Sequence, residues 1–166
     1  MPANEHKVHV SALTWIAVAL LHREHPEKDE FTEAEIVSRA EAEEGLGPAR
    51  LRPELRVYVS VHCVANKKPS PGRYRMLFET RPGNRRLYRP GDPIHPEREF
   101  GKHIPPLDAL PDNYKALIDW YRKEYAIRRS VPSVEDPILA LRGLGHEIWR
   151  DEKPDAYVRR LREARE

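Results

Sequence analysis

The chain has 166 residues, with 29 Lys and Arg against 27 Asp and Glu and a formal net charge of +2. That length suits one domain with an appendage and is enough to bury a hydrophobic core. No apolar run approaches the roughly 18 residues that a membrane-spanning helix needs, and the single cysteine excludes a disulfide framework and a cysteine-rich zinc site. The N-terminus lacks the order of a signal peptide, so we expect a cytoplasmic protein.

Two helices are predicted in the first part of the chain. Apolar residues recur at steps of three and four over 10–22, which marks one face of a helix. The second helix has Thr32 as its expected N-cap, with Glu35 three residues later to complete a capping box, and Gly45 closes it. Between residues 27 and 44 eight acids face two bases, a net charge of −6. This second helix is therefore not expected to lie along phosphates.

A third helix is predicted from Pro53 to about residue 65, because proline is well accepted at the first helical position. Leu55, Val59 and Cys63 recur at four-residue steps and are expected to pack inward. The other sides carry Arg56, Val57, Ser60, Val61 and Val64. That outer surface is unusually apolar for a helix that reads DNA.

A β-hairpin is predicted after the third helix. Residues 73–79 alternate, with Tyr74, Met76 and Phe78 on one face, which indicates a half-buried strand. Residues 81–84, Arg-Pro-Gly-Asn, fit a type II turn, and residues 85–89 return as the partner strand. The whole segment 50–89 holds eleven Lys and Arg against two acids, a net charge of +9 that the rest of the chain cancels.

Three further segments are predicted beyond the hairpin. Six prolines between residues 90 and 111 indicate an extended linker, 91–111, either free or laid over the surface, and not a folded unit. Residues 112–129 have the spacing of an amphipathic helix with an aromatic face, which would pack on the first domain or on a second subunit. Residues 133–166 form a tail with two short helical patterns. We expect this tail to become ordered on a partner, the alternative being a terminal helix folded back on its own domain.

A helix followed by a basic hairpin is typical of the second half of a winged helix-turn-helix, whose second helix enters the DNA major groove. We therefore expect an α+β, mainly α, fold, with a DNA-binding domain of this kind over residues 1–90. The third helix would contact base edges, while lysines and the arginines of the wing would neutralise phosphates. The expected DNA-binding residues are Arg52, Arg56, Ser60, Asn66, Lys67, Lys68, Arg73, Arg81, Asn84, Arg85 and Arg86.

Two resemblances agree with this prediction. Residues 8–90 resemble a winged-helix domain family of unknown function, through ELRVYVSVHCVAN, KKPSPG and GNRRLYRP. Residues 135–166 resemble the C-terminal tail of bacterial and archaeal antitoxins of type II toxin–antitoxin pairs, through DPILALRGLGHEIW and PDAYVRRLRE. In those families the head binds operator DNA and the tail wraps a toxin, commonly a PIN-domain ribonuclease. The common antitoxin head is a swapped-hairpin fold, from which this chain departs.

The second resemblance implies a set of toxin-binding residues. Apolar side chains of the tail would fill a groove on the toxin, and one arginine, such as Arg159, would reach the toxin's acidic metal site. The implied residues are Ile138, Leu141, Leu144, Ile148, Trp149, Tyr157, Val158, Leu161 and Arg159. The chain would then be a homodimeric antitoxin that represses its own operon. The alternatives are a stand-alone winged-helix regulator with a structural tail, and a protein-interaction module that does not bind DNA.

No enzyme, cofactor or metal site is predicted. Cys63 and His62 are adjacent on a helix, so their side chains point about 100° apart and cannot easily share a proton. Two pairs of histidines have the i, i+3 spacing of metal ligands: His6 with His9, and His22 with His25. Neither pair has a third ligand near it in the sequence.

Overall fold

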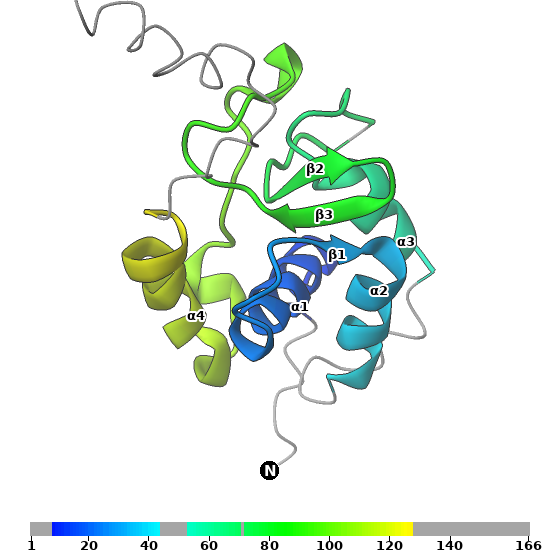
Figure 1. Cartoon of the computed structure of the whole chain (residues 1–166). Coiled ribbons are helices and arrows are strands. Elements are labelled where there is room, and N and C mark those ends of the chain that lie inside the picture. Colours follow the sequence, from blue (N-terminus) through cyan, green and yellow to red (C-terminus); the bar gives the residue numbers. More distant parts are fainter. Residues whose placement is uncertain (1–7, 44–52, 71, 128–166) are drawn as a thin grey trace, which may run out of the picture. The chain divides into compact units, whose positions relative to one another are not determined.

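The computed structural model describes residues 8–43, 53–70 and 72–127, which belong to one compact unit that ends at Arg128 (Figure 1). The α+β class is confirmed. The α-helices are α1 (Val10–Glu24), α2 (Glu33–Ala42), α3 (Leu55–Val57) and α4 (Ala116–Trp120), and the strands are β1 (Phe31–Thr32), β2 (Leu77–Arg81) and β3 (Asn84–Leu87). No helix in the described ranges has the length and apolar character needed to cross a membrane. Arg52 and the tail residues predicted to bind a toxin lie outside the described residues.

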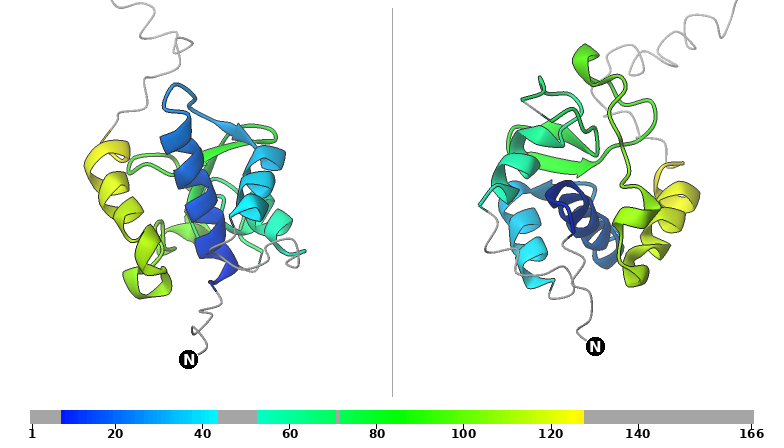
Figure 2. Two further views of the ribbon diagram at one scale, coloured as in Figure 1. Left: turned by 90° about the horizontal axis from the view of Figure 1, so that it is seen from below. Right: turned by 180° about the vertical axis from the view of Figure 1, so that it is seen from behind.

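Helix α1 is the centre of the hydrophobic core. It lies between α2 on one side and α4 on the other (Figure 2). The sequence predicts one apolar face, but most of the helix is buried, including Thr14, Trp15 and Val18. His9 is the N-cap, because its Nδ1 accepts the backbone N–H of Ser11 at 3.2 Å. Neighbours on several sides thus explain why the helix is apolar on several sides.

Helix α2 begins at the predicted capping box. The Thr32 hydroxyl accepts the backbone N–H of Glu35 at 3.2 Å, and the Glu35 carboxylate accepts the backbone N–H of Thr32 at 2.8 Å. Two of the N–H groups that a helix leaves free at its start are thereby satisfied. The backbone N–H of Glu33 donates to the carbonyl of Gly83 at 3.0 Å. This bond joins the start of α2 to the turn of the hairpin.

Helix α3 continues as a π-helical turn over Tyr58–His62, in which the N–H of Cys63 reaches back to the carbonyl of Tyr58 at 3.0 Å. Leu55, Val59 and Cys63 are buried, as predicted. Val64, expected on the outer surface, is buried as well. The helical segment ends before it, and the chain crosses to the sheet.

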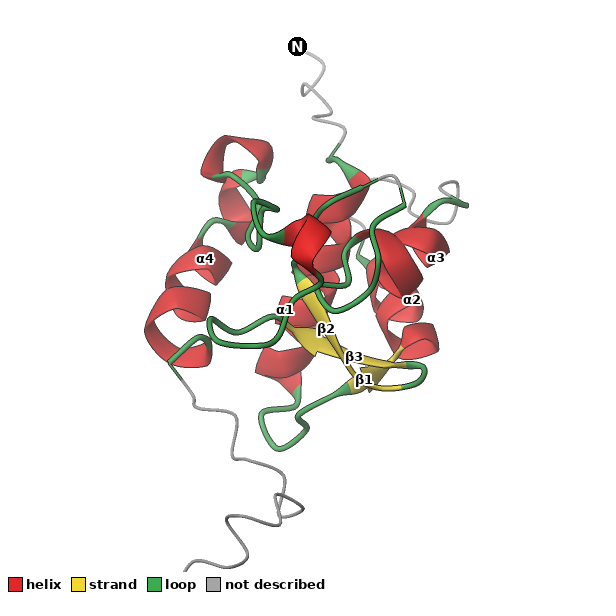
Figure 3. Cartoon of the chain, turned by 90° about the horizontal axis from the view of Figure 1, so that it is seen from above, coloured by secondary structure: helices red, strands yellow, loops and turns green. Residues whose placement is uncertain are grey.

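The three strands form one antiparallel sheet with the order β1-β3-β2 (Figure 3). The predicted type II turn is confirmed by the positive φ of Gly83, +83°, which a side chain would strain. The first strand of the hairpin, β2, begins later than predicted, at Leu77. Met76 and Leu77 are both buried although they point to opposite faces. Both faces are covered because helices lie on one side of the hairpin and the proline-rich segment on the other (Figure 1).

Residues 91–111, predicted as an extended linker and not a folded unit, are hydrogen-bonded to the rest of the unit. The N–H of His95 donates to the carbonyl of Ala65 at 2.8 Å, and the carbonyl of Lys102 accepts the N–H of Arg75 at 3.0 Å. Single turns of 3₁₀-helix span Pro96–Arg98, Leu107–Ala109 and Asp112–Tyr114. The segment therefore folds onto the hairpin and the end of α3.

The aromatic face of the predicted helix 112–129 packs within the same unit. Helix α4 continues as a π-helical turn over Tyr121–Tyr125. The hydroxyl of Tyr121 donates to the carbonyl of Tyr88 at 2.6 Å, and the ring of Tyr121 lies 5.8 Å from that of Trp15. Tyr121 and Tyr125 are 1% and 2% exposed. Of the two alternatives, the structure has the intramolecular one, so this face is not available to a second subunit.

Candidate nucleic-acid interface

The outer face of α3 and its π-helical turn is open to solvent. Arg56 is exposed, Val57 is 43% exposed and Ser60 is half-buried. No acid among the described residues forms an ion pair with Arg56. A free guanidinium beside an apolar side chain can contact a phosphate and a thymine methyl.

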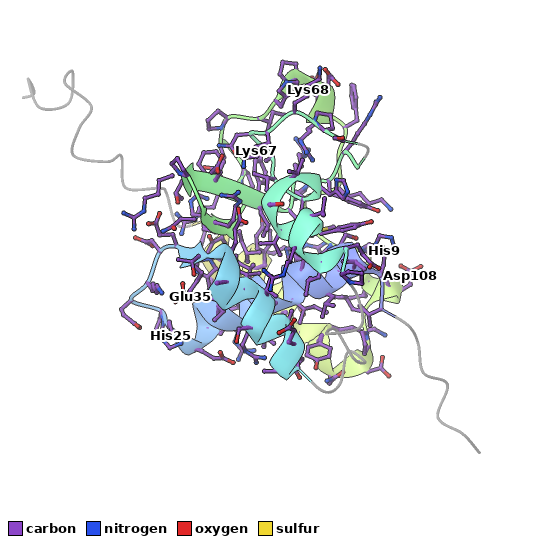
Figure 4. The ribbon with its side chains drawn as sticks, turned by 90° about the vertical axis from the view of Figure 1, so that its right-hand side faces the viewer. His9, His25, Glu35, Lys67, Lys68 and Asp108 are labelled. Atoms are coloured by element: carbon purple, nitrogen blue, oxygen red, sulfur yellow. The ribbon has the colours of Figure 1, made fainter. Side chains whose placement is uncertain are left out.

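The turn after α3 contains both structural and free polar side chains. The Asn66 amide donates to the carbonyl of Glu79 at 2.9 Å and accepts its N–H at 3.0 Å, as a paired strand would. Lys67 lies 3.1 Å from the Glu79 carboxylate. Lys68 and Arg73 are exposed and have no ion-pair partner in the described ranges. Figure 4 shows Lys67 and Lys68 beyond the end of α3, well away from Glu35.

The turn of the hairpin is held by Glu30. The Asn84 amide donates to this carboxylate at 2.7 Å, Arg81 lies 2.5 Å from it, and the Thr80 hydroxyl also donates to it. Burial raises the pKa of Glu30, but the hydrogen bonds from Thr80 and Asn84 and the charge of Arg81 outweigh burial and lower it. The Asn84 amide therefore forms a structural hydrogen bond that holds the hairpin turn. Arg81 is 69% exposed and can still reach a phosphate.

Arg85 does not lie where the sequence prediction puts it. Its side chain is fully buried, with an exposed fraction of 0%. The guanidinium contacts the carboxylates of Glu33 at 2.6 Å and Glu79 at 2.8 Å, and donates to the carbonyls of Val59 at 3.3 Å and Ser60 at 3.2 Å. It joins β3 to α2 and to the α3 segment. The prediction that Arg85 binds phosphate is wrong because its donors point inward.

Arg86 is also buried, which corrects its predicted role in phosphate binding. Both of its terminal nitrogens donate to the Asp92 carboxylate, each at 2.7 Å, and its guanidinium lies 4.6 Å from the centre of the Phe78 ring. Burial lowers the pKa of Arg86, but the hydrogen bond and charge of Asp92 outweigh burial and raise it. With 6% of its surface exposed, Arg86 cannot bind phosphate as predicted.

Arg98 is a structural cation that the sequence prediction missed. It is fully buried, and no carboxylate in the described part of the chain pairs with it. Its guanidinium donates to the carbonyls of five residues: Val61, His62, Lys67, Lys68 and Tyr74. Two of these carbonyls belong to the end of the π-helical turn, where the helix dipole favours a cation. No local pattern around Arg98 indicates this role.

The accessible cations therefore differ from the predicted set. Those that are exposed around the end of α3 and the hairpin are Arg56, Lys68, Arg73, Arg81 and Lys102, while Lys67 and Arg75 are half-buried. Lys102, which lies in the supposed linker, was not predicted. Because the buried arginines are neutralised in place or held by carbonyls, the positive field comes from the turn between α3 and β2.

The same region shows no arrangement for nucleophilic or metal chemistry. Cys63 is 0% exposed, and burial raises the pKa of its thiol far above the usual value, which keeps it protonated. Burial and the charge of Arg98 lower the pKa of His62. Within the described ranges, no three His, Cys, Asp or Glu side chains are grouped so as to hold a metal ion.

No protein family model, no curated protein and no solved structure matches the chain.

Proposed function

We propose that residues 8–90 are a winged helix-turn-helix that binds duplex DNA. The order of elements supports this: a helix, a short strand, two helices and a hairpin, with β1 paired to β3 at one side of the sheet. In such a domain α2 and the α3 segment would be the helix-turn-helix pair, and the β2–β3 hairpin would be the wing.

The observation that carries the proposal is the group of unpaired cations beside the open face of α3. Arg56, Lys68 and Arg73 are exposed, and none of the described acids forms an ion pair with them. Cations of this kind neutralise phosphates and release counterions, while Val57 and Ser60 can contact bases.

The hairpin has a smaller role here than the sequence suggests. Arg81 is its single exposed arginine, because Arg85 and Arg86 are buried. The turn is tied to α2, so the proposed wing would contact the backbone at its tip and not enter a groove. A homodimer on a palindromic site, as many regulators form, would need a surface other than the buried face of α4.

The test is the salt dependence of binding to duplex DNA, measured by fluorescence anisotropy. The double variant Arg56→Ala/Lys68→Ala should bind more weakly and lower the slope of log K against log salt by about two, since each phosphate contact contributes about 0.9. The control, Arg122→Ala/Lys123→Ala, removes the same charge from exposed residues beside α4 and should change little. No binding at low salt, or an equal loss in both variants, would contradict the proposal.

The antitoxin function is proposed from the sequence of residues 135–166 alone. Under this proposal the chain retains the product of the neighbouring gene, a PIN-type ribonuclease, through apolar side chains such as Leu141 and Trp149. The double variant Leu141→Ala/Trp149→Ala should lose the partner in a co-purification yet still bind DNA. If removing residues 133–166 instead unfolds the head, the alternative of a stand-alone regulator with a structural tail is favoured.

A further inference from the structure

Phe100 is almost completely exposed. At 95% it is the most exposed of the large apolar side chains in the described ranges, ahead of Ile127 at 70% and Leu107 at 56%. A single exposed apolar residue on a flexible loop would be ordinary. Phe100, however, lies in the tip formed by residues 98–101 of the proline-rich segment, and this tip is held in place on both sides of Phe100.

On the N-terminal side the tip is fixed by Arg98. The guanidinium donates to the carbonyls of Val61 and His62, both at 2.8 Å, and of Lys67 at 2.6 Å. Residue 98 is thus bound to the end of the same helical segment whose outer face is proposed to contact DNA. Phe100, two residues later, keeps a fixed position relative to α3.

On the C-terminal side the tip is fixed by Gly101. A Cβ atom at this position would lie 1.8 Å from the backbone oxygen of Arg73, so no other residue fits without moving the backbone. The N–H of Gly101 donates to the carbonyl of Arg98 at 2.9 Å, and its own carbonyl accepts Arg75 Nε at 2.7 Å. An aromatic side chain presented in this way loses little conformational entropy on binding.

The charges around the tip favour a polyanion. Lys68, Arg73 and Lys102 are exposed and unpaired in the described structure. The Arg98 guanidinium donates to the carbonyl of Lys68 at 3.4 Å, and the backbone of Gly101 lies against that of Arg73. Two exposed acids, Glu97 and Glu99, lie on the same turn. The cations outnumber these acids, so the local net charge is positive and would attract phosphates.

We infer that Phe100 is a wedge that enters between stacked bases of duplex DNA, beside the site contacted by α3. Apolar side chains used in this way enter from the minor groove, unstack one step and bend the duplex, while neighbouring cations hold the phosphates. Pyrimidine–purine steps such as TA and CA open most easily, so the wedge should prefer them. This inference rests on the proposed DNA binding and adds how the duplex is deformed.

The test uses the full chain and duplexes of about 30 base pairs rich in TA and CA steps. Each duplex carries, at one of successive positions, a fluorescent purine analogue that brightens when it unstacks. The unmodified chain should brighten the analogue at one step, and Phe100→Ala should abolish the brightening and weaken binding about tenfold. Leu107→Ala, which removes another exposed apolar side chain of the proline-rich segment, is the matched control. Because Phe100 makes almost no packing contacts, its replacement should leave the thermal unfolding temperature unchanged.

The outcomes separate this inference from the proposed function. If Phe100→Ala binds and brightens like the unmodified chain while Arg56→Ala/Lys68→Ala loses affinity, the wedge is wrong and the α3 interface stands. If the unmodified chain does not bind duplex DNA, both are wrong. If Phe100→Ala leaves DNA binding intact but loses a protein that the unmodified chain retains, Phe100 is a protein contact and the wedge is overturned. Lys102→Ala should lower the salt slope by about one and keep the brightening at saturation.

Discussion

The β2–β3 hairpin and the proline-rich segment 91–111 hold their arginines in different ways. In the hairpin, Arg85 and Arg86 bind carboxylates, those of Glu33, Glu79 and Asp92. In the proline-rich segment, Arg98 binds backbone carbonyls only. Both arrangements remove positive charge from the surface, so a count of basic residues overstates the field that a ligand meets.

The difference also separates the two regions in their response to acid. A carboxylate whose pKa is lowered in the folded state loses its stabilising effect as pH falls, whereas a backbone carbonyl does not titrate. Burial raises the pKa of Glu79, but the hydrogen bond from Lys67 and the charge of Arg85 outweigh burial and lower it. The hairpin should therefore loosen in acid before residues 98–101, the part of the proline-rich segment that Arg98 holds, whereas Asp92 at the start of that segment belongs to the acid-sensitive contacts.

The largest effect is expected from Arg98→Met. The change leaves several buried carbonyls without a donor, and it should lower the free energy of unfolding by about 3–5 kcal/mol. Urea denaturation measures this, with Arg122→Met, an exposed position, as the control at under about 0.5 kcal/mol. A loss below about 1 kcal/mol for Arg98→Met would mean that water replaces the guanidinium, and that the segment is not held as described.

A smaller loss, about 2–3 kcal/mol, is expected for Arg85→Met. Its partner Glu33 is 37% exposed and can return to water, which reduces the cost. Arg81→Ala, in the same hairpin but 69% exposed, should cost under about 0.5 kcal/mol. In DNA binding the order of the two variants should reverse, because the salt slope would fall by up to about one for Arg81→Ala and stay constant for Arg85→Met. A lower slope for folded Arg85→Met would show that its charge reaches the surface after all.

The next effect concerns the backbone of the proline-rich segment. Gly101→Ala should cost about 1–3 kcal/mol, because the new methyl group would collide with the backbone of Arg73 and the tip must move. Gly72→Ala is the matched control, since its Cβ would meet neighbours at ordinary distances of 3.5 Å and beyond. Equal unfolding free energies for the two variants would mean that the tip is not fixed.

The sequence predicts the local features of this fold well. The capping box at Thr32 and the turn at Gly83 each depend on residues a few positions apart, and the inward residues of α3 follow from helical period alone. Arg98 could not be found this way, because its acceptors lie 24 to 37 residues before it. Its binding site exists only once the chain has folded.

The sequence prediction misplaces Arg85 because the hairpin contains a local irregularity. A regular hairpin with its turn at Pro82 and Gly83 would place Arg85 opposite Thr80. In the structure Glu79 is opposite Arg85, and Arg81 is opposite Asn84, so Thr80 is an extra residue on β2. Such a bulge shifts the cross-strand partners by one residue, which places Arg85 beside Glu79 on the buried face. The sequence shows the turn, but nothing in it marks the bulge.

The smallest effect is expected at the capping box of α2, which positions Glu33 against the hairpin. The hydrogen bond from Lys28, followed by that from the backbone of Thr32, lowers the pKa of Glu35 to about 2 from its usual 4.5. Because the unfolded chain then binds the proton more readily, this contribution is complete above about pH 4.5 and is lost as pH falls towards about 2. Glu35→Gln should therefore flatten the pH dependence of the urea midpoint in that window.

Only part of that pKa shift should appear as stability, since the Glu35 side chain is 41% exposed and screened by solvent. Thr32→Ala removes the other half of the box and should cost about 1 kcal/mol at neutral pH. In both variants Arg98 keeps its carbonyl partners, so hydrogen exchange of the Gly101 amide should stay slow while that of the Glu33 amide, bonded to the hairpin turn, becomes faster. If the two amides accelerate together, the hairpin and the proline-rich segment open as one unit, and the acid-sensitive and acid-insensitive anchors are not independent.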